Sequence, residues 1–319
     1  MNPRILFAAL ALICAWPALA QQWPARNVRI IVPFPAGGNT DTIARITAEY
    51  LGAKLGRPFV VENRPGAGGA IAAEAVARAP ADGYTLFLAA LPQLAILPAI
   101  AKVPYDPVKD FAPVSIVGRN MFALALHPSV PATSLKEFVA HVKSRPDRLP
   151  YASAGAGTVS HLSVVLLLNR AGIEMINIPY KGGPPALADV MAGHATLYFG
   201  NLTEIAPQAR AGKVRVIAVS GESRTPLLPD VATVAEQGFP GYRTETWNSI
   251  VAPAATPTPI ITRLAAEIAA ATRDPAIIAK LDAIGVEPVG NTPAEFARTL
   301  EADIRTWGEA ARLSGERLN

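Results

Sequence analysis

The sequence predicts an α/β protein with two lobes, each a mainly parallel sheet flanked by helices. Three observations predict this fold class. From residue 28 onward, short β-branched runs alternate with helical stretches, as in βαβ units. Glycine-rich turns stand where a strand passes into a helix. About 300 residues remain after a predicted leader, which is enough for two domains of ordinary size.

The first residues have the layout of a secretory signal peptide. Arg4 precedes an apolar run over residues 5–16, and the small residues Ala18 and Ala20 follow it. This pattern predicts a signal peptide over residues 1–20. The apolar run is too short for a permanent membrane helix, and no later stretch approaches about 18 uninterrupted apolar residues. We therefore expect a soluble mature protein.

The single cysteine, Cys14, lies inside that leader, so the mature chain has neither a disulfide nor a thiol nucleophile. A lipoprotein anchor at Cys14 is the alternative, but Leu12 and Ile13 before it lack the small residue that such processing prefers. Export of a cysteine-free chain of this size favours the bacterial periplasm. The net charge is +4, and the basic residues are spread along the chain without a run of Lys or Arg. This distribution excludes a nucleic-acid patch.

The first part of the chain alternates strands and helices. We expect a helix that carries Ile43, Ile46 and Tyr50 and stops at Gly56. An alanine-rich helix follows and continues through Arg78. The strands of this part are expected at residues 28–32, 59–61 and 84–88.

A second series of strands and helices follows. Its strands are expected at residues 121–126, 149–152, 176–178, 195–199, 214–219 and 243–251, with two terminal helices after them. The chain is therefore predicted to leave the first lobe, build the second, and return. We expect lobe one to comprise residues 21–123 and 247–319, and lobe two residues 124–246. Two such crossings would form a hinge.

Three glycine turns mark the strand-to-helix junctions, at residues 35–41, 66–69 and 154–158. Ligands of open α/β sheets bind at this edge, and the free N–H groups that begin a helix suit a carboxylate or phosphate. Alternatively, the glycines only end strands, and Asp41 or Thr158 only caps a helix. No turn has the G-x-G-x-x-G spacing of a dinucleotide site, and none is followed by a Walker lysine.

The four histidines do not predict a metal site or a catalytic site. None of His127, His141, His161 and His194 is paired at metal-ligand spacing, so neither a metal nor a cofactor is expected. Ser160 and His161 are adjacent and cannot face each other on a helix, and no G-x-S-x-G elbow exists. We expect no enzyme. His161 contacts a ligand, orients the loop, or is purely structural.

Several motifs in order carry a family resemblance: VRIIVPFPAGGNTD, VENRPGAGG with ADGYTL behind it, YASAGAGTVSHL, IPYKGGPPAL and LPDVATVAEQGFPGY. Over nearly the whole mature chain, the sequence resembles the Bug family of tripartite tricarboxylate transporter substrate-binding receptors. The resemblance implies a periplasmic-binding-protein (Venus-flytrap) fold. It also implies a periplasmic solute-binding receptor that captures a small carboxylate ligand for delivery to the membrane permease subunits of such a transporter.

The resemblance also implies the residues that bind the ligand. They are Phe34, Ala36, Gly37, Gly38, Asp41, Ala89, Ala90, Ala156, Gly157, Thr158, His161 and Gly200. Some family members present their ligand to a sensor kinase, so a sensing co-receptor is an alternative function. A periplasmic enzyme on the same scaffold is a further alternative, because fold does not settle function. We expect a monomer.

The sequence departs from the family pattern at two pocket positions. Ala156 stands where many members carry asparagine, and Gly200 stands where an aspartate commonly follows the strand phenylalanine. Both differences remove a polar group from the expected pocket. Since a buried ammonium needs an acidic partner, we predict a ligand without an amino group, either aromatic or aliphatic.

Overall fold

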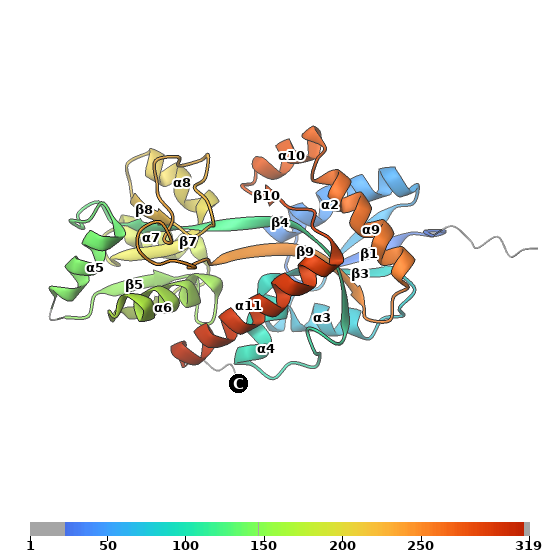
Figure 1. Ribbon diagram of the computed structural model, residues 1–319, viewed down its shortest axis with the longest axis horizontal. Helices are drawn as coiled ribbons and strands as arrows, with labels where there is room; N and C mark the ends of the chain where they lie inside the picture. The colour runs from blue at the N-terminus through green and yellow to red at the C-terminus, as the bar shows by residue number, and fades with distance from the viewer. Residues whose placement is uncertain (1–22, 146, 316–319) are drawn as a thin grey trace, which may run out of the picture.

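The computed structural model describes residues 23–145 and 147–315, so the predicted signal peptide lies outside the described residues. Two lobes lie side by side along the long axis of the molecule, and two long strands run between them (Figure 1). Each lobe has a sheet with helices on both faces, which confirms the two-lobed α/β fold class.

Lobe one contains most of the N-terminal part of the chain and the helices that follow residue 257. Its elements are β1 (Val28–Val32), α2 (Asn39–Leu55), β2 (Phe59–Asn63), α3 (Ala70–Ala77), β3 (Thr85–Ala90), α4 (Leu97–Ile100), α9 (Thr258–Ala271), α10 (Pro275–Asp282) and β10 (Glu287–Pro288). The apolar spacing predicted for residues 43–55 produces α2, which ends at Gly56 in a left-handed conformation. The strands β2, β1 and β3 pair in parallel.

Lobe two contains the middle of the chain. Its elements are α5 (Leu135–Lys143), β5 (Pro150–Ser153), α6 (Val159–Ala171), β6 (Ile176–Pro179), α7 (Gly183–Met191), β7 (Leu197–Asn201), α8 (Leu202–Arg210) and β8 (Arg215–Val219). The strands β6, β5 and β7 pair in parallel. The predicted strands of this part are present with small shifts at their ends.

Two strands connect the lobes. β4 (Phe111–Leu126) begins well before the strand predicted at residues 121–126, and β9 (Glu245–Pro253) brings the chain back. β4 pairs with β9 and β10 in lobe one and with β7 and β8 in lobe two. β4 is antiparallel to all of these strands, and β9 is also antiparallel to β3. The prediction of mainly parallel sheets is therefore wrong, and both sheets are mixed.

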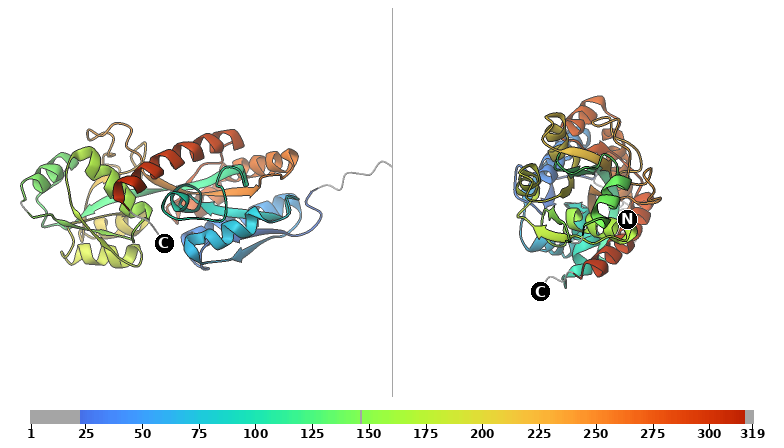
Figure 2. Two further views of the ribbon diagram at one scale, coloured as in Figure 1. Left: turned by 90° about the horizontal axis from the view of Figure 1, so that it is seen from below. Right: turned by 90° about the vertical axis from the view of Figure 1, so that its left-hand side faces the viewer.

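The last helix, α11 (Pro293–Ser314), extends along both lobes (Figure 2). It contacts α4 of lobe one and α6 of lobe two, and it buries Phe296 and Trp307 in a core shared by the lobes. Three helices of the described chain, rather than the predicted two, follow β9. The division of the chain at residues 123 and 246 stays a prediction.

Candidate functional site

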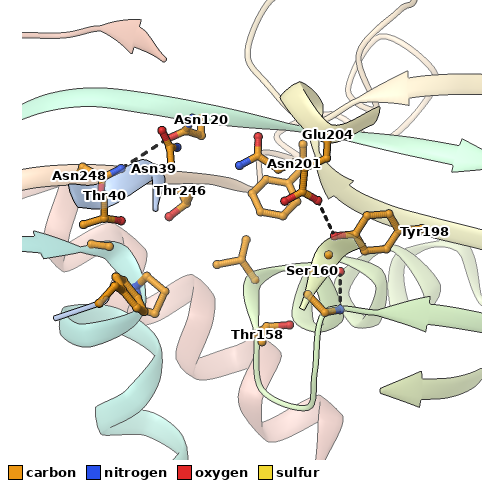
Figure 3. A pocket seen from close by; sticks show the side chains of 17 residues that line it. Asn39, Thr40, Asn120, Thr158, Ser160, Tyr198, Asn201, Glu204, Thr246 and Asn248 are labelled. Atoms are coloured by element: carbon orange, nitrogen blue, oxygen red, sulfur yellow. Dashed lines mark hydrogen bonds between the residues drawn. The ribbon is translucent and has the colours of Figure 1, made fainter. Parts of the chain in front are cut away.

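A cavity of about 260 Å³ lies between the two lobes. Lobe one contributes the start of α2 and the end of β3, lobe two contributes the starts of α6, α7 and α8, and the crossing strands close one side (Figure 3). Its lining residues are Phe34, Asn39, Thr40, Ala90, Pro92, Asn120, Phe122, Ala154, Thr158, Val159, Ser160, Gly183, Tyr198, Asn201, Glu204, Thr246 and Asn248. Helix N-termini carry unpaired N–H groups and partial positive charge, so this cavity favours an anion.

The loop before α2 is held by Asp41. The Asp41 carboxylate accepts a hydrogen bond from the Gly37 N–H at 2.9 Å and further bonds from Arg45 and Asn63. Burial alone would raise the pKa of Asp41, but these hydrogen bonds outweigh it and lower the pKa to about 2. Gly38, the residue before the helix, makes no side-chain cap. The first N–H groups of α2 are therefore left for a ligand.

The loop before α6 is held by a histidine and a threonine. The Gly157 N–H donates to Nδ1 of His161 at 3.1 Å, and the His161 ring stacks on Tyr151. Thr158 caps the helix, since its hydroxyl accepts from the His161 N–H at 3.3 Å and donates to the Gly155 carbonyl at 2.7 Å. The side-chain positions of this loop are therefore fixed from within lobe two.

Three of the predicted ligand-binding residues line the cavity, namely Phe34, Ala90 and Thr158. Asp41 and His161 are 2% and 4% exposed and hold the loops instead of lining the cavity. Five residues form the loops themselves without lining the cavity: Ala36, Gly37, Gly38, Ala156 and Gly157. Whether each of them contacts a ligand stays a prediction.

Ala89 and Gly200 also lie away from the cavity lining. Ala89 is fully buried in the hydrophobic core, because its side chain points to the opposite face of β3 from that of Ala90. The ring of Tyr198 packs over Gly200, where an added Cβ would lie 1.9 Å from Tyr198 Cε1. Gly200 thus makes room for Tyr198, which does line the cavity.

The cavity contains an acidic group that does not come from the position of Gly200. Glu204, in the first turn of α8, lines the cavity and lies 3.4 Å from the Tyr198 hydroxyl. Burial raises the pKa of Glu204, and the hydrogen bond from Tyr198 opposes that effect. The sequence pattern around residue 200 gave no sign of this carboxyl group because it comes from the following helix.

An amide-rich wall was also missed by the sequence reasoning. Nδ2 of Asn248 in β9 donates to Oδ1 of Asn120 in β4 at 3.4 Å. The side-chain oxygens of Asn39 and Asn248 are buried without a hydrogen-bond partner among the described residues. Thr246 and Asn248 are two residues apart on β9, so their side chains share one face of the strand. This spacing can be read from the sequence. Trp247 faces the other way, packs on Phe296 and donates to Asp303.

The described residues include no group of three or more His, Cys, Asp or Glu side chains able to hold a metal ion. No helix among the described residues combines the length and apolar character needed to cross a membrane.

Two α/β lobes, two crossing strands and a cavity between the lobes are the architecture of solute-binding receptors. The chain belongs to the tripartite tricarboxylate transporter receptor family, because the model of that family matches residues 43–313. This match confirms the resemblance found in the sequence. The family consists of receptors that work with tripartite transporters, and it is not a family of enzymes.

Curated relatives agree over most of the chain. The sequence is 36% identical to Protein BugT of Bordetella pertussis over 315 residues, which is 98% of this chain and 96% of BugT. It is 37% identical to a UPF0065 protein of Bordetella bronchiseptica over 298 residues, which is 93% of this chain and 88% of the relative.

Solved structures share the fold. A Rhodopseudomonas palustris protein solved with adipate has a TM-score of 0.78 at 38% identity, covering 93% of this chain and all of that chain. MatC from the same species, solved with bound malate, has a TM-score of 0.73 at 33% identity, covering 90% of this chain and 99% of MatC. A Polaromonas solute-binding protein has a TM-score of 0.81 at 24% identity, and the match covers 91% of this chain and 99% of that chain. At this identity it supports the fold alone.

Proposed function

We propose that this protein is a periplasmic receptor that captures a small carboxylate in the interlobe cavity and delivers it to the membrane subunits of a tripartite transporter. The observation that carries the proposal is the meeting of two helix N-termini from opposite lobes at one cavity, namely α2 with Asn39 and Thr40, and α6 with Thr158 and Ser160. Since each terminus favours an anion, a carboxylate between them would contact both lobes.

The binding energy would come from hydrogen bonds that close the hinge. A ligand bound by both lobes has a higher affinity for the closed state, so binding shifts the population toward closure. Hydrogen bonds to a charged group contribute about 1.5–3 kcal/mol each, and the uncapped start of α2 offers several donors. The adipate and malate of the two solved relatives support a carboxylate ligand here as well.

The geometry supports capture without chemistry. Ser160, the one serine that lines the cavity within the described chain, accepts the Ala154 N–H at 3.3 Å. The Nδ1 atom of His161 accepts the Gly157 N–H, so it is not directed at Ser160 as a catalytic base would be. We accordingly propose a receptor that releases its ligand unchanged, and that acts as a monomer.

Thermal-shift screening of the mature protein against mono-, di- and tricarboxylates tests this function. A ligand that binds only the folded state adds about 2.7 kcal/mol at 100 times its dissociation constant, so one carboxylate class should raise the melting temperature by several degrees. Ala90→Leu should abolish the shift by filling the cavity, whereas the surface control Ile71→Ala should retain it. Absence of any shift with all acids would contradict the proposal.

A further inference from the structure

The cavity contains one carboxyl group and no cation among the side chains that the structure describes there. Glu204 is the one ionisable acidic residue among the described residues that line the cavity, and no Lys, Arg or His lines it. None of the ion pairs of the described chain includes Glu204. Among the described residues, its one hydrogen-bond partner is the Tyr198 hydroxyl, at a long 3.4 Å. The carboxyl therefore keeps acceptor capacity that the protein does not use.

The surrounding structure fixes this carboxyl in place. The Tyr198 ring packs over Gly200, which directs its hydroxyl toward Glu204. Burial raises the pKa of Tyr198 far above neutrality, so its hydroxyl stays a donor. On the other side, a Cβ at Gly183 would lie 2.1 Å from Oε2 of Glu204, so the carboxyl lies against the start of α7. Glycine at residue 183 leaves room for it.

Glu204 is close to the proposed carboxylate position. Ser160, in the first turn of α6, interacts with the same Tyr198 hydroxyl that contacts Glu204. Figure 3 shows Glu204, Tyr198 and Ser160 on one side of the cavity, with Thr40 and Asn248 opposite. A ligand whose carboxylate lies at the start of α6 would therefore present its other end to Glu204.

The chemistry of that second end is constrained by charge. A second carboxylate beside Glu204 would place two like charges in a cavity whose described lining has no cation, or would require one of the two groups to take up a proton. An uncharged alkyl end would offer Glu204 no hydrogen bond, so the buried carboxyl would keep only its long contact with Tyr198. An ammonium would instead pair with Glu204 and balance the charge in the cavity.

We propose that Glu204 determines the specificity of this cavity and that the captured carboxylate also carries a protonated amine. This inference rests on the proposed function and narrows its ligand class. Carboxylates without an amine are expected to bind more weakly than amino acids of matched length. The expectation of an amine-free ligand, drawn from Gly200, is thereby reversed.

Calorimetric titration of the full mature protein with matched ligands tests the inference. The probes form three matched sets. 4-Aminobutyrate is compared with butyrate and succinate, alanine with propionate, and glutamate with glutarate. The tightest amine-bearing probe should bind at least tenfold more tightly than its partners without the amine. Glu204→Gln should weaken that probe by tenfold or more and remove the preference, because glutamine keeps the size of the side chain but cannot pair with an ammonium. Glu174→Gln, at an exposed ion pair of the same lobe, should change nothing.

The pH dependence gives a second readout. Tyr198 is the titratable group that faces Glu204, and it stays protonated at neutral and acidic pH. Burial raises the pKa of Glu204, and acidification protonates it and removes the partner of the ammonium, so affinity for the amine-bearing probe should fall as the pH is lowered. Glu204→Gln should lose this dependence. A receptor that used a protonated Glu204 to bind a diacid would show the opposite trend.

The outcomes separate the inference from the proposed function. Tight binding of succinate or glutarate, with no amine-bearing probe tighter and no effect of Glu204→Gln, overturns the inference and leaves the carboxylate receptor standing. Failure of every acid, including those of the thermal-shift screen, overturns both.

Discussion

The two loops that face each other across the cavity perform the same task with different side chains. In each, a glycine N–H is held by a side chain four residues later, Gly37 by Asp41 and Gly157 by His161. The lobe-two helix also has a side-chain cap, Thr158, whereas the lobe-one helix begins at Gly38 without one. A rigid anion site thus needs a braced loop, and the uncapped α2 leaves more of its first N–H groups to a ligand than α6 does, where the cap takes the His161 N–H.

The largest effect is expected from Asp41→Ala. The change removes the acceptor of the Gly37 N–H and the carboxylate that Arg45 and Asn63 both contact. We expect a loss of about 3 kcal/mol in the free energy of unfolding, together with loss of ligand binding, measured by urea denaturation and calorimetry. Asp41→Asn keeps an acceptor and should lose less. Equal losses in the two variants would contradict a role for the retained side-chain acceptor, and no loss in Asp41→Asn would contradict a role for the charge.

The loop before α2 should also respond to acid. The pKa of Asp41 is lowered to about 2 in the folded protein, so its stabilisation is present above the unfolded value near 4 and is lost as the pH falls toward 2. The shift corresponds to roughly 2 kcal/mol. The stability difference between the wild type and Asp41→Asn, measured by denaturation from pH 5 to pH 2, should shrink over this window. A constant difference would refute the assignment.

A smaller effect is expected from His161→Phe. Phenylalanine keeps a ring against Tyr151 but removes the acceptor of the Gly157 N–H. The free energy of unfolding should fall by about 1–2 kcal/mol, with weaker ligand binding. His141→Phe, on a helix away from the cavity, serves as the control. If His161→Phe is as stable as the wild type, the loop is not held by this hydrogen bond.

The smallest change in stability, and the sharpest separation of the loops, is expected from Gly38→Ser. Its backbone is extended and a Cβ there meets nothing closer than 3.8 Å, so serine can cap α2. Compared with Gly38→Ala, the serine variant should be about 1 kcal/mol more stable and should bind the ligand about tenfold more weakly, because the cap competes for the same N–H groups. Unchanged affinity would mean that these groups do not bind the ligand.

The sequence predicted the loops better than the cavity wall. Apolar spacing and the glycines marked where β1 passes into α2 and β5 into α6, since both signals are local in the chain. The wall around Glu204 depends on Tyr198 packing over Gly200 and on the start of the next helix. The full length of β4 was also missed, because its first half is defined by pairing with β9 and not by its own pattern.

A crystal structure of the mature receptor with its tightest ligand tests the central claim most directly. The account predicts a carboxylate in the interlobe cavity, with its oxygens within hydrogen-bonding distance of the first N–H groups of α2 and α6, next to Thr40 and Ser160. A ligand held outside the cavity, or with its carboxylate away from both helix starts, would contradict the account.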